Sequence, residues 1–297
     1  LQRDFPTQYA KDLFYEKRNK DYIFVGDNPF YSLRNTNGLK RDRVFGNIGA
    51  KYKIYNWLSA EGMMGIDFYN EYRKQITQSG TVNNMQRGRG GQFTENSQFS
   101  QEINLDFMLN FDKTFGDFRV DGLVGVNRRN NKFNSMRLSA PDLTVPDIYA
   151  ISNVKGTPGV GNFKSEYETQ SAYFSANGSY KDYLFLGITG RNDWSSTLPS
   201  SSRSFFYPSV SLGLSVTDAF NLRSENLSYF KLRANWAQVG GATDPYQLSR
   251  TYSAGSYNGI SYFSPTSTLP PTDLKPFKTS SYEFGTEMRL LKDRISL

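Results

Sequence analysis

The feature that most constrains the fold is a strict alternation of apolar and polar residues over long segments. In residues 99–111, apolar side chains occupy the odd positions almost throughout, and Ser, Glu, Asn or Asp occupies most of the even ones. A repeat of two residues is the period of a β-strand, whose successive side chains point to opposite faces. The segment is about twice as long as the usual soluble strand of about five or six residues. We therefore expect long, two-faced strands.

The same alternation recurs along the chain and predicts about ten strands. Short links between several of them predict hairpins of neighbouring strands. The fold class expected is all-β, an antiparallel up-and-down meander of about ten long strands. The predicted strands are residues 44–56, 59–73, 99–111, 118–127, 168–180, 183–191, 206–216, 230–239, 280–290 and 295–297.

The lengths of the connections add a second constraint, because short and long ones alternate. A strand that crosses a bilayer at about 45° needs about nine to eleven residues, and outer-membrane barrels have tight turns at one end and large loops at the other. We therefore interpret residues 1–43 as an extracellular loop and the segment that leads into a barrel, and residues 44–297 as a partial transmembrane β-barrel. The long extracellular loops are expected near residues 74–98, 131–167, 192–205 and 240–279.

Charged residues decide which face of each strand would meet lipid. Lys231 or Arg233 on the lipid side would each cost about 2–4 kcal/mol near the bilayer midplane. The opposite phase of the strand avoids this cost, and the same reasoning orients the other strands. The lipid-facing residues expected are Phe99, Ile103, Leu105, Phe107, Leu109, Leu232, Trp236, Phe284 and Met288.

Composition narrows the classes of function. No segment approaches the roughly 18 apolar residues of a spanning helix. The chain has no Cys and no His, which removes thiol and imidazole chemistry and the common zinc ligands. We expect no enzyme activity, no catalytic residues, no cofactor and no metal site. The net charge of +7 is scattered, so we do not expect a nucleic-acid partner.

Several motifs spread over nearly the whole chain resemble one family of membrane proteins. They are the segment at residues 28–74, RNDWSSTLP at 191–199, FYPSVSLGLSV at 206–216, YFKLRANWAQVGG at 229–241 and LKPFKTSSYEFGTEMRLLKDRISL at 274–297. Together and in this order they resemble the middle and late barrel of TonB-linked outer-membrane transporters of the SusC/RagA type from Bacteroidetes. Asn56 departs from the pattern, because the family often has Asp before the tryptophan at this point.

The resemblance implies a barrel of about 22 strands closed by a plug domain. About ten strands would then be an open, curved portion of it, and we expect the chain to be a fragment. It also implies a place in the cell outer membrane, in contact with lipid and lipopolysaccharide. The implied partners are a SusD-like surface lipoprotein and the TonB complex, reached through an N-terminal part that would precede this chain.

The activity implied by the resemblance is import of oligosaccharides or peptides without chemical change. Aromatic faces and hydrogen-bonding groups suit oligosaccharides, and charges suit peptides. On the loops and the upper inward positions, the candidate substrate contacts are Arg191, Asp193, Trp194, Tyr246, Tyr257 and Tyr262.

Two alternatives remain open at the level of sequence. The strand pattern alone fits a passive porin-like barrel equally well. A soluble β-rich glycan-binding module would instead pack the apolar face of its sheet on a second sheet. The length of the strands and the asymmetry of the loops disfavour the soluble module.

Overall fold

A computed structural model of the chain describes residues 33–81, 90–271 and 273–297. Most of the expected leading segment, residues 1–32, lies outside the described residues, as do residues 82–89 and 272 of two expected loops. Among the described residues, no helix is long and apolar enough to cross a membrane.

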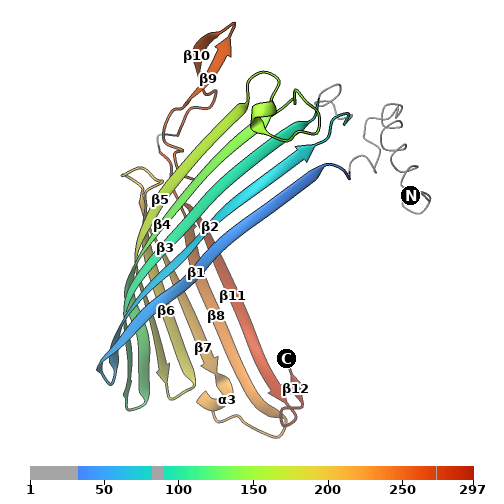
Figure 1. Ribbon diagram of the computed structural model, residues 1–297. Coiled ribbons are helices and arrows are strands. Elements are labelled where there is room, and N and C mark those ends of the chain that lie inside the picture. Colours follow the sequence, from blue (N-terminus) through green and yellow to red (C-terminus); the bar gives the residue numbers. More distant parts are fainter. Residues whose placement is uncertain (1–32, 82–89, 272) are drawn as a thin grey trace, which may run out of the picture. The chain divides into compact units, whose positions relative to one another are not determined.

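Ten strands form one sheet in the order β1-β2-β3-β4-β5-β6-β7-β8-β11-β12, which confirms the predicted all-β meander (Figure 1). β1 and β12 lie at opposite ends of this order, so the described part of the sheet does not close on itself. The strands of the sheet are β1 (Thr36–Tyr55), β2 (Leu58–Thr77), β3 (Gln92–Phe115), β4 (Phe118–Ala140), β5 (Gly159–Tyr180), β6 (Leu184–Ser195), β7 (Ser204–Ser215), β8 (Leu227–Gly241), β11 (Phe277–Leu290) and β12 (Ile295–Ser296).

The first five strands are longer than the alternation predicts. They have 20 to 24 residues each, and β3 begins at Gln92 rather than at residue 99. The long connections shrink accordingly to residues 78–91, 141–158, 196–203 and 242–276. Alternation marks only the part of a strand with one regular apolar face, whereas backbone pairing continues where apolar and polar residues no longer alternate.

The connection after β8 contains a hairpin that the sequence analysis missed. β9 (Tyr252–Tyr257) and β10 (Ile260–Pro265) pair with each other in a sheet of their own, and they stand beyond the ends of β8 and β11 (Figure 1). Asn258 and Gly259 form the turn, both with positive φ, at 49° and 79°. Asn-Gly is the preferred pair for a two-residue turn of this kind, so the signal was present in the sequence.

Two of the connections at the other end of β5 to β11 are tight, the one after β5 and the one after β11. Lys181 and Asp182 follow β5 with positive φ, and the turn after β11 holds three successive residues of this type, Leu291 to Asp293. The longer link between β7 and β8 starts with the single helical turn α3 (Val216–Ala219). The link between β7 and β8 covers residues 216–226 and is longer than the connection 196–203 at the other end, so the predicted alternation of short and long connections does not hold for this pair.

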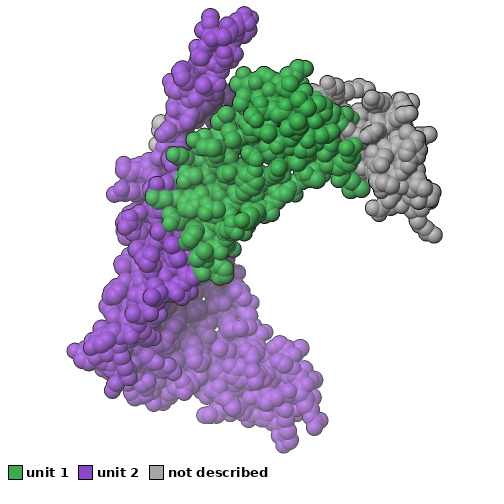
Figure 2. Space-filling view, in the orientation of Figure 1, with its two compact units in different colours: residues 1–45, 67–101, 132–165 green, residues 46–66, 102–131, 166–297 purple. Residues whose placement is uncertain are grey.

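The contacts of the chain group into two compact units, coloured green and purple in Figure 2. Unit 1 comprises residues 1–45, 67–101 and 132–165, and unit 2 comprises residues 46–66, 102–131 and 166–297. In unit 1 a small core of Phe93, Ala140 and Leu143 is covered by the connection after β4, which includes the 3-10 turn η1 (Ile151–Asn153). Each unit contains parts of several strands. The boundary predicted from the sequence instead divides the chain once, between residues 43 and 44.

Candidate functional site

One face of the sheet in unit 2 is apolar from β6 to β11. The strand register aligns side chains that the alternation alone could not pair, and it joins them into one continuous surface. These pairs are Leu184↔Leu214, Leu186↔Leu212, Ile188↔Val210, Val210↔Trp236, Leu214↔Leu232 and Trp236↔Tyr282. Phe284 and Met288 lie on the same face, opposite Ala234 and Phe230.

This apolar face is bare rather than packed. Leu186, Leu212 and Leu232 are all exposed, and Phe284 is 81% exposed. Among the described residues, the buried apolar side chains are Phe93, Ala140, Leu143, Leu198 and Phe205, and none of these lies in the apolar face. Contiguous apolar surface of this extent is unfavourable in water, so it requires an apolar environment such as acyl chains.

The apolar row of β3 is bare in the same way. Asn104 and Asp106 point to the polar face, where Asn127 donates to Asn104 Oδ1 at 2.8 Å and the Tyr173 hydroxyl donates to Asp106 Oδ1 at 3.1 Å. By alternation, the odd-numbered row of Phe99, Ile103, Leu105, Phe107 and Leu109 lies on the other face. Leu105 and Phe107 are 40% and 52% exposed. The nine expected lipid-facing residues are therefore on the apolar side of their strands.

Two glycines fit aromatic rings on opposite faces of β5 and its neighbours. A Cβ at Gly190 would lie 2.5 Å from the Phe174 ring on the apolar face, and a Cβ at Gly125 would lie 2.6 Å from the Tyr173 ring on the polar face. Both distances are too short for a side chain. Glycine at these positions leaves room for the rings on the neighbouring strand.

The opposite face is polar and carries charges of both signs. Lys231 is opposite Glu287, Arg233 is opposite Gly285, and Asn235 is opposite Glu283. Charges in this position avoid the cost of meeting lipid. The polar face therefore suits contact with water or with a polar solute.

A group of hydrogen-bonded side chains, which we call the polar cluster, lies on this polar face. Its members are Asp106, Ser171, Tyr173, Arg191, Asp193 and Tyr207, from β3, β5, β6 and β7. Arg191 Nε donates to Asp193 Oδ1 at 2.7 Å, and an Arg191 terminal nitrogen donates to Ser171 Oγ, also at 2.7 Å. Asp193 is only 8% exposed.

Aromatic side chains extend the polar cluster on both sides of Arg191. The Tyr207 hydroxyl donates to Asp193 Oδ2 at 2.5 Å, and the Arg191 guanidinium lies 5.6 Å from the centre of the Tyr173 ring. Each charge in the cluster thus has at least two partners, which holds the side chains in fixed positions.

A cavity of about 280 Å³ adjoins the polar cluster at the long-connection end of the strands. Asp193 belongs to the polar cluster and also lines this cavity. The cavity, which we call the inner cavity, is lined by charged, aromatic and backbone groups, among them Arg129, Tyr167, Asp193, Phe205 and Asp244. It offers donors, acceptors and both signs of charge to a solute on the polar face.

The structure separates the six predicted substrate contacts. Arg191 and Asp193 meet in the polar cluster. Trp194 lies on the opposite face, because it is the register partner of Gln170 and neighbouring residues of a strand point to opposite sides. Trp194 therefore does not share a face with Arg191 and Asp193.

The three predicted tyrosines lie outside the polar cluster. The Tyr246 hydroxyl accepts a hydrogen bond from the Glu166 backbone N–H at 3.0 Å, which ties the connection after β8 to β5. Tyr257 and Tyr262 belong to the β9–β10 hairpin, and both are exposed. Their role in binding stays a prediction.

Sequence reasoning missed Asp106, Ser171, Tyr173 and Tyr207 as partners of Arg191 and Asp193. Each of them lies at a position of its strand that alternation assigns to the polar face, so the sequence pattern contained part of the information. The rest depends on register, since Asp193 reaches Tyr207 only because it pairs with Phe205 and Arg191 pairs with Tyr207.

Comparison with known proteins gives a match to one family along almost the whole chain. The sequence profile described as "TonB dependent receptor-like, beta-barrel" matches residues 2–297. No curated protein matches the chain significantly.

Solved structures share the fold at low sequence identity. A structure of the RagAB peptide importer in the "closed-closed" state is 17% identical and has a TM-score of 0.79, covering 91% of this chain and 30% of that one. A structure of the RagAB peptide transporter is 16% identical, has a TM-score of 0.80, and covers 93% of this chain and 31% of that one. The siderophore receptor PiuA from Acinetobacter baumannii is 12% identical with a TM-score of 0.51, covering 87% of this chain and 39% of that one. The chain thus spans about a third of the length of the structures it matches.

Proposed function

Because the chain belongs to the TonB dependent receptor-like β-barrel family, we propose that it forms part of the wall of a transporter that imports oligosaccharides or peptides through the outer membrane. The family places the chain in the outer membrane, and the likeness to the RagAB peptide importer supports transport as the proposed activity of the whole protein. The substrate, the partners and the role of individual residues are our proposal.

The observation that carries the proposal is the division of the sheet into a bare apolar face and a polar face with an ordered cluster. Lipid would cover the first face, and the second would line the path of the solute. The nine expected lipid-facing residues then meet acyl chains, with lipopolysaccharide in the outer leaflet. A soluble module would need a second layer over the apolar face, and its exposed Leu105, Phe107 and Phe284 argue against one.

Substrate contact is assigned to the polar cluster, the inner cavity and the long connections. Arg191, Asp193 and Arg129 offer charges of both signs, which suits the termini and side chains of a peptide. The likeness to the RagAB peptide importer supports the same class. Tyr173 and Tyr207 provide ring surfaces and hydroxyls, which would suit a sugar as well. Tyr246, Tyr257 and Tyr262 are proposed to contact substrate from the connection after β8.

The partners proposed are a SusD-like surface lipoprotein over the long connections and the TonB complex as the source of energy. The exposed β9–β10 hairpin provides apolar surface for such a lid. A passive porin-like barrel is the remaining alternative, and no feature of the described residues favours it.

Uptake by cells that carry the complete gene tests the proposal. Cells lacking it are complemented with the wild type or with a double variant, Arg191→Gln with Arg129→Gln, and are given labelled peptide or oligosaccharide mixtures. We expect uptake that requires TonB and that falls in the double variant. Uptake that is equal in a strain without TonB would instead identify a passive pore. Asn127→Ala, on the same polar face but outside the cluster, serves as the control.

A further inference from the structure

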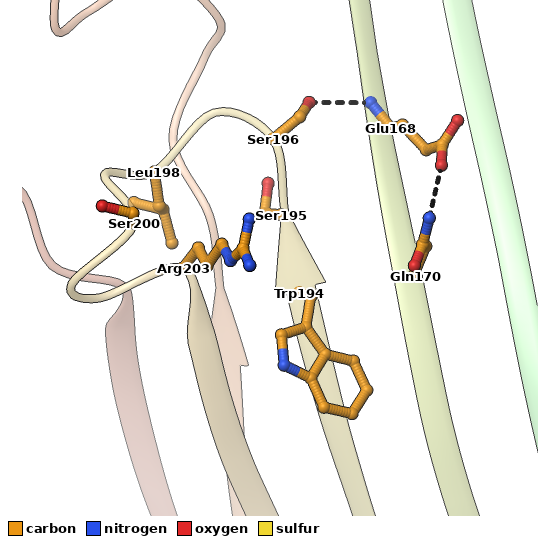
Figure 3. A pocket seen from close by; sticks show the side chains of 8 residues that line it. All are labelled: Glu168, Gln170, Trp194, Ser195, Ser196, Leu198, Ser200 and Arg203. Carbon is orange, nitrogen blue, oxygen red and sulfur yellow. Dashed lines mark hydrogen bonds between the residues drawn. The ribbon is translucent and has the colours of Figure 1, made fainter.

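A second cavity lies on the apolar side of the sheet, at the long-connection end of β5 and β6 (Figure 3). Its volume is about 660 Å³, and it lies entirely within unit 2. We call it the rim pocket. It is lined by Glu168, Gln170, Trp194, Ser195, Ser196, Leu198, Ser200 and Arg203.

The strand register places the rim pocket on the face opposite the polar cluster. Gln170 and Trp194 are direct partners, and they share their face with Phe174 and Ile188. Along β6 this face runs from Leu184 through Leu186 and Ile188 to Trp194. The rim pocket therefore begins where the apolar surface ends.

Trp194 marks this boundary. Its ring is partly exposed, and in Figure 3 it lies below the polar side chains of the rim pocket. An indole combines an apolar ring with one N–H donor, and it is favoured at the level where acyl chains meet headgroups. The adjoining Gln170, Ser196 and Ser200 are hydrogen-bonding residues of the kind that a sugar requires.

The net charge of the rim pocket is positive, because among the described residues its carboxylate is paired and one arginine is not. Glu168 accepts a hydrogen bond from Arg128 at 2.8 Å and another from Gln170, also at 2.8 Å, so its charge is compensated. Arg128 lies on the same face, one residue before the inward-facing Arg129. Within the described part of the chain, Arg203 has no ion-pair partner, and its guanidinium points toward Ser195 and Trp194 (Figure 3).

We propose that the rim pocket binds the phosphorylated sugar headgroup of an outer-leaflet glycolipid of the lipid A type. Arg203 pairs with a phosphate, the serines and Gln170 bind sugar hydroxyls, and the acyl chains lie along Ile188, Leu186 and their neighbours. This assignment rests on the orientation in the proposed function, in which the long connections are extracellular. Continuity with the apolar face selects a lipid over a free sugar phosphate.

The rim pocket is separate from the proposed substrate path. Arg191 and Asp193 project from the other side of β6, so a glycolipid in the rim pocket does not compete with a solute. Its effect would be to fix the ends of β5 and β6 and the connection 196–203 against the membrane surface.

Native mass spectrometry of the complete transporter in nanodiscs of phosphatidylethanolamine tests this assignment. Bisphosphorylated lipid A, dephosphorylated lipid A and phosphatidylglycerol are added in turn. We expect the wild type to retain bisphosphorylated lipid A, and Arg203→Gln to bind it about ten-fold more weakly, the loss of one charge-assisted contact. Trp194→Ala should also weaken binding.

Arg129→Gln is the matched control, since it removes the same charge at the same end of the sheet but from the other face. It should bind lipid A as the wild type does. Equal loss in Arg129→Gln and Arg203→Gln would overturn the rim pocket as the site. Equal retention of dephosphorylated lipid A or of phosphatidylglycerol would overturn the phosphorylated-sugar assignment. Heat-modified mobility of each variant on gels verifies that the barrel has folded.

A separate measurement tests the orientation. The chain has no cysteine, so Asn258→Cys in the β9–β10 turn can be labelled on intact cells with an impermeant maleimide. Labelling without lipid A binding would overturn the rim pocket and leave the proposed function in place. Failure to label on intact cells, with labelling after lysis, would overturn the orientation and with it the outer-leaflet ligand.

Discussion

Apolar side chains have opposite surroundings in the small core of unit 1 and on the strands of unit 2. In unit 1, Phe93, Ala140 and Leu143 are buried beneath the connection after β4, with Tyr149 and Ile151 packed against them. In unit 2, Leu186, Leu232 and Phe284 are left exposed on one face of the sheet. The same residue types are thus buried by a loop of the chain in the first region. In the second region they stay exposed, and a medium other than water would have to cover them. Burial therefore depends on the solvent that each segment meets.

The strongest test of the covered region is Phe93→Ala. Phe93 is almost fully buried, and the Lys74 ammonium lies 5.1 Å from the centre of its ring. Removing the ring should cost about 3–5 kcal/mol of local stability. Hydrogen exchange should then accelerate at the Leu143 amide, which donates to the Gly91 carbonyl. Phe163→Ala, the same truncation at an exposed site, should leave this exchange unchanged, and equal protection in both variants would contradict the covered core.

The bare region is tested by placing a charge on it. Leu232→Arg should cost about 2–4 kcal/mol if this face meets the bilayer midplane. The measurement is the urea midpoint of the complete protein refolded into lipid vesicles. Asn235→Arg, on the polar face of the same strand and opposite Glu283, should be tolerated. If the two arginines cost the same, the distinction between the faces fails.

A smaller effect is expected on the polar face. Tyr207→Phe removes the hydroxyl that donates to Asp193 and should cost about 1.5–3 kcal/mol, the range for hydrogen bonds to charged groups. The same urea titration measures it. Tyr282→Phe makes the identical change on the apolar face and should shift the midpoint little. A larger shift in Tyr282→Phe would contradict the ordering role of the polar cluster.

The smallest effect concerns the link between β7 and β8. The Ser215 hydroxyl donates to Asp218 at 2.5 Å, and this bond, together with Arg223, lowers the pKa of the Asp218 carboxyl below its ordinary value. A lowered pKa means that the carboxylate stabilises the fold above about pH 4 and that this contribution is lost as the pH falls through the folded-state pKa. Exposed pairs of this kind contribute about 0.2–1 kcal/mol.

Hydrogen exchange at the Phe220 amide, which donates to the Val216 carbonyl, reports on this link. Protection in the wild type should decline as the medium is acidified below pH 4. In Asp218→Asn it should be lower at neutral pH and should not change over the same range. An unchanged wild-type profile would show that Asp218 does not stabilise the link.

The sequence was sufficient for the number and order of the strands in the ten-stranded sheet and for their two faces. The alternation at residues 99–111 and 230–239 reflects a real difference in surroundings, so it orients Leu105 and Leu232 correctly relative to their neighbours. The lengths of the connections were predicted less well, because the link 216–226 is longer than the connection 196–203. The resemblance noted in the motifs agrees with the family match and with the shared fold.

What the sequence could not provide is register. Alternation is unchanged when one strand slides by two residues past another, so it cannot bring Tyr207 to Asp193 or Tyr173 to Asp106. The alternation also begins only at residue 99, because residues 92–98 at the start of β3 do not alternate regularly between apolar and polar types. The sequence analysis expects Asp193 and Trp194 in a loop at 192–205, whereas β6 continues to Ser195, so these adjacent residues point to opposite faces of a strand.

The β9–β10 hairpin has a practical consequence. Because its two strands pair in a sheet of their own, its backbone hydrogen bonds do not enter the ladder of the ten-stranded sheet. Exchanging it for a peptide tag, or for the corresponding segment of a relative, should leave the rest of the fold intact. The hairpin is thus a suitable position for a graft, which in the proposed orientation would be displayed on the cell surface.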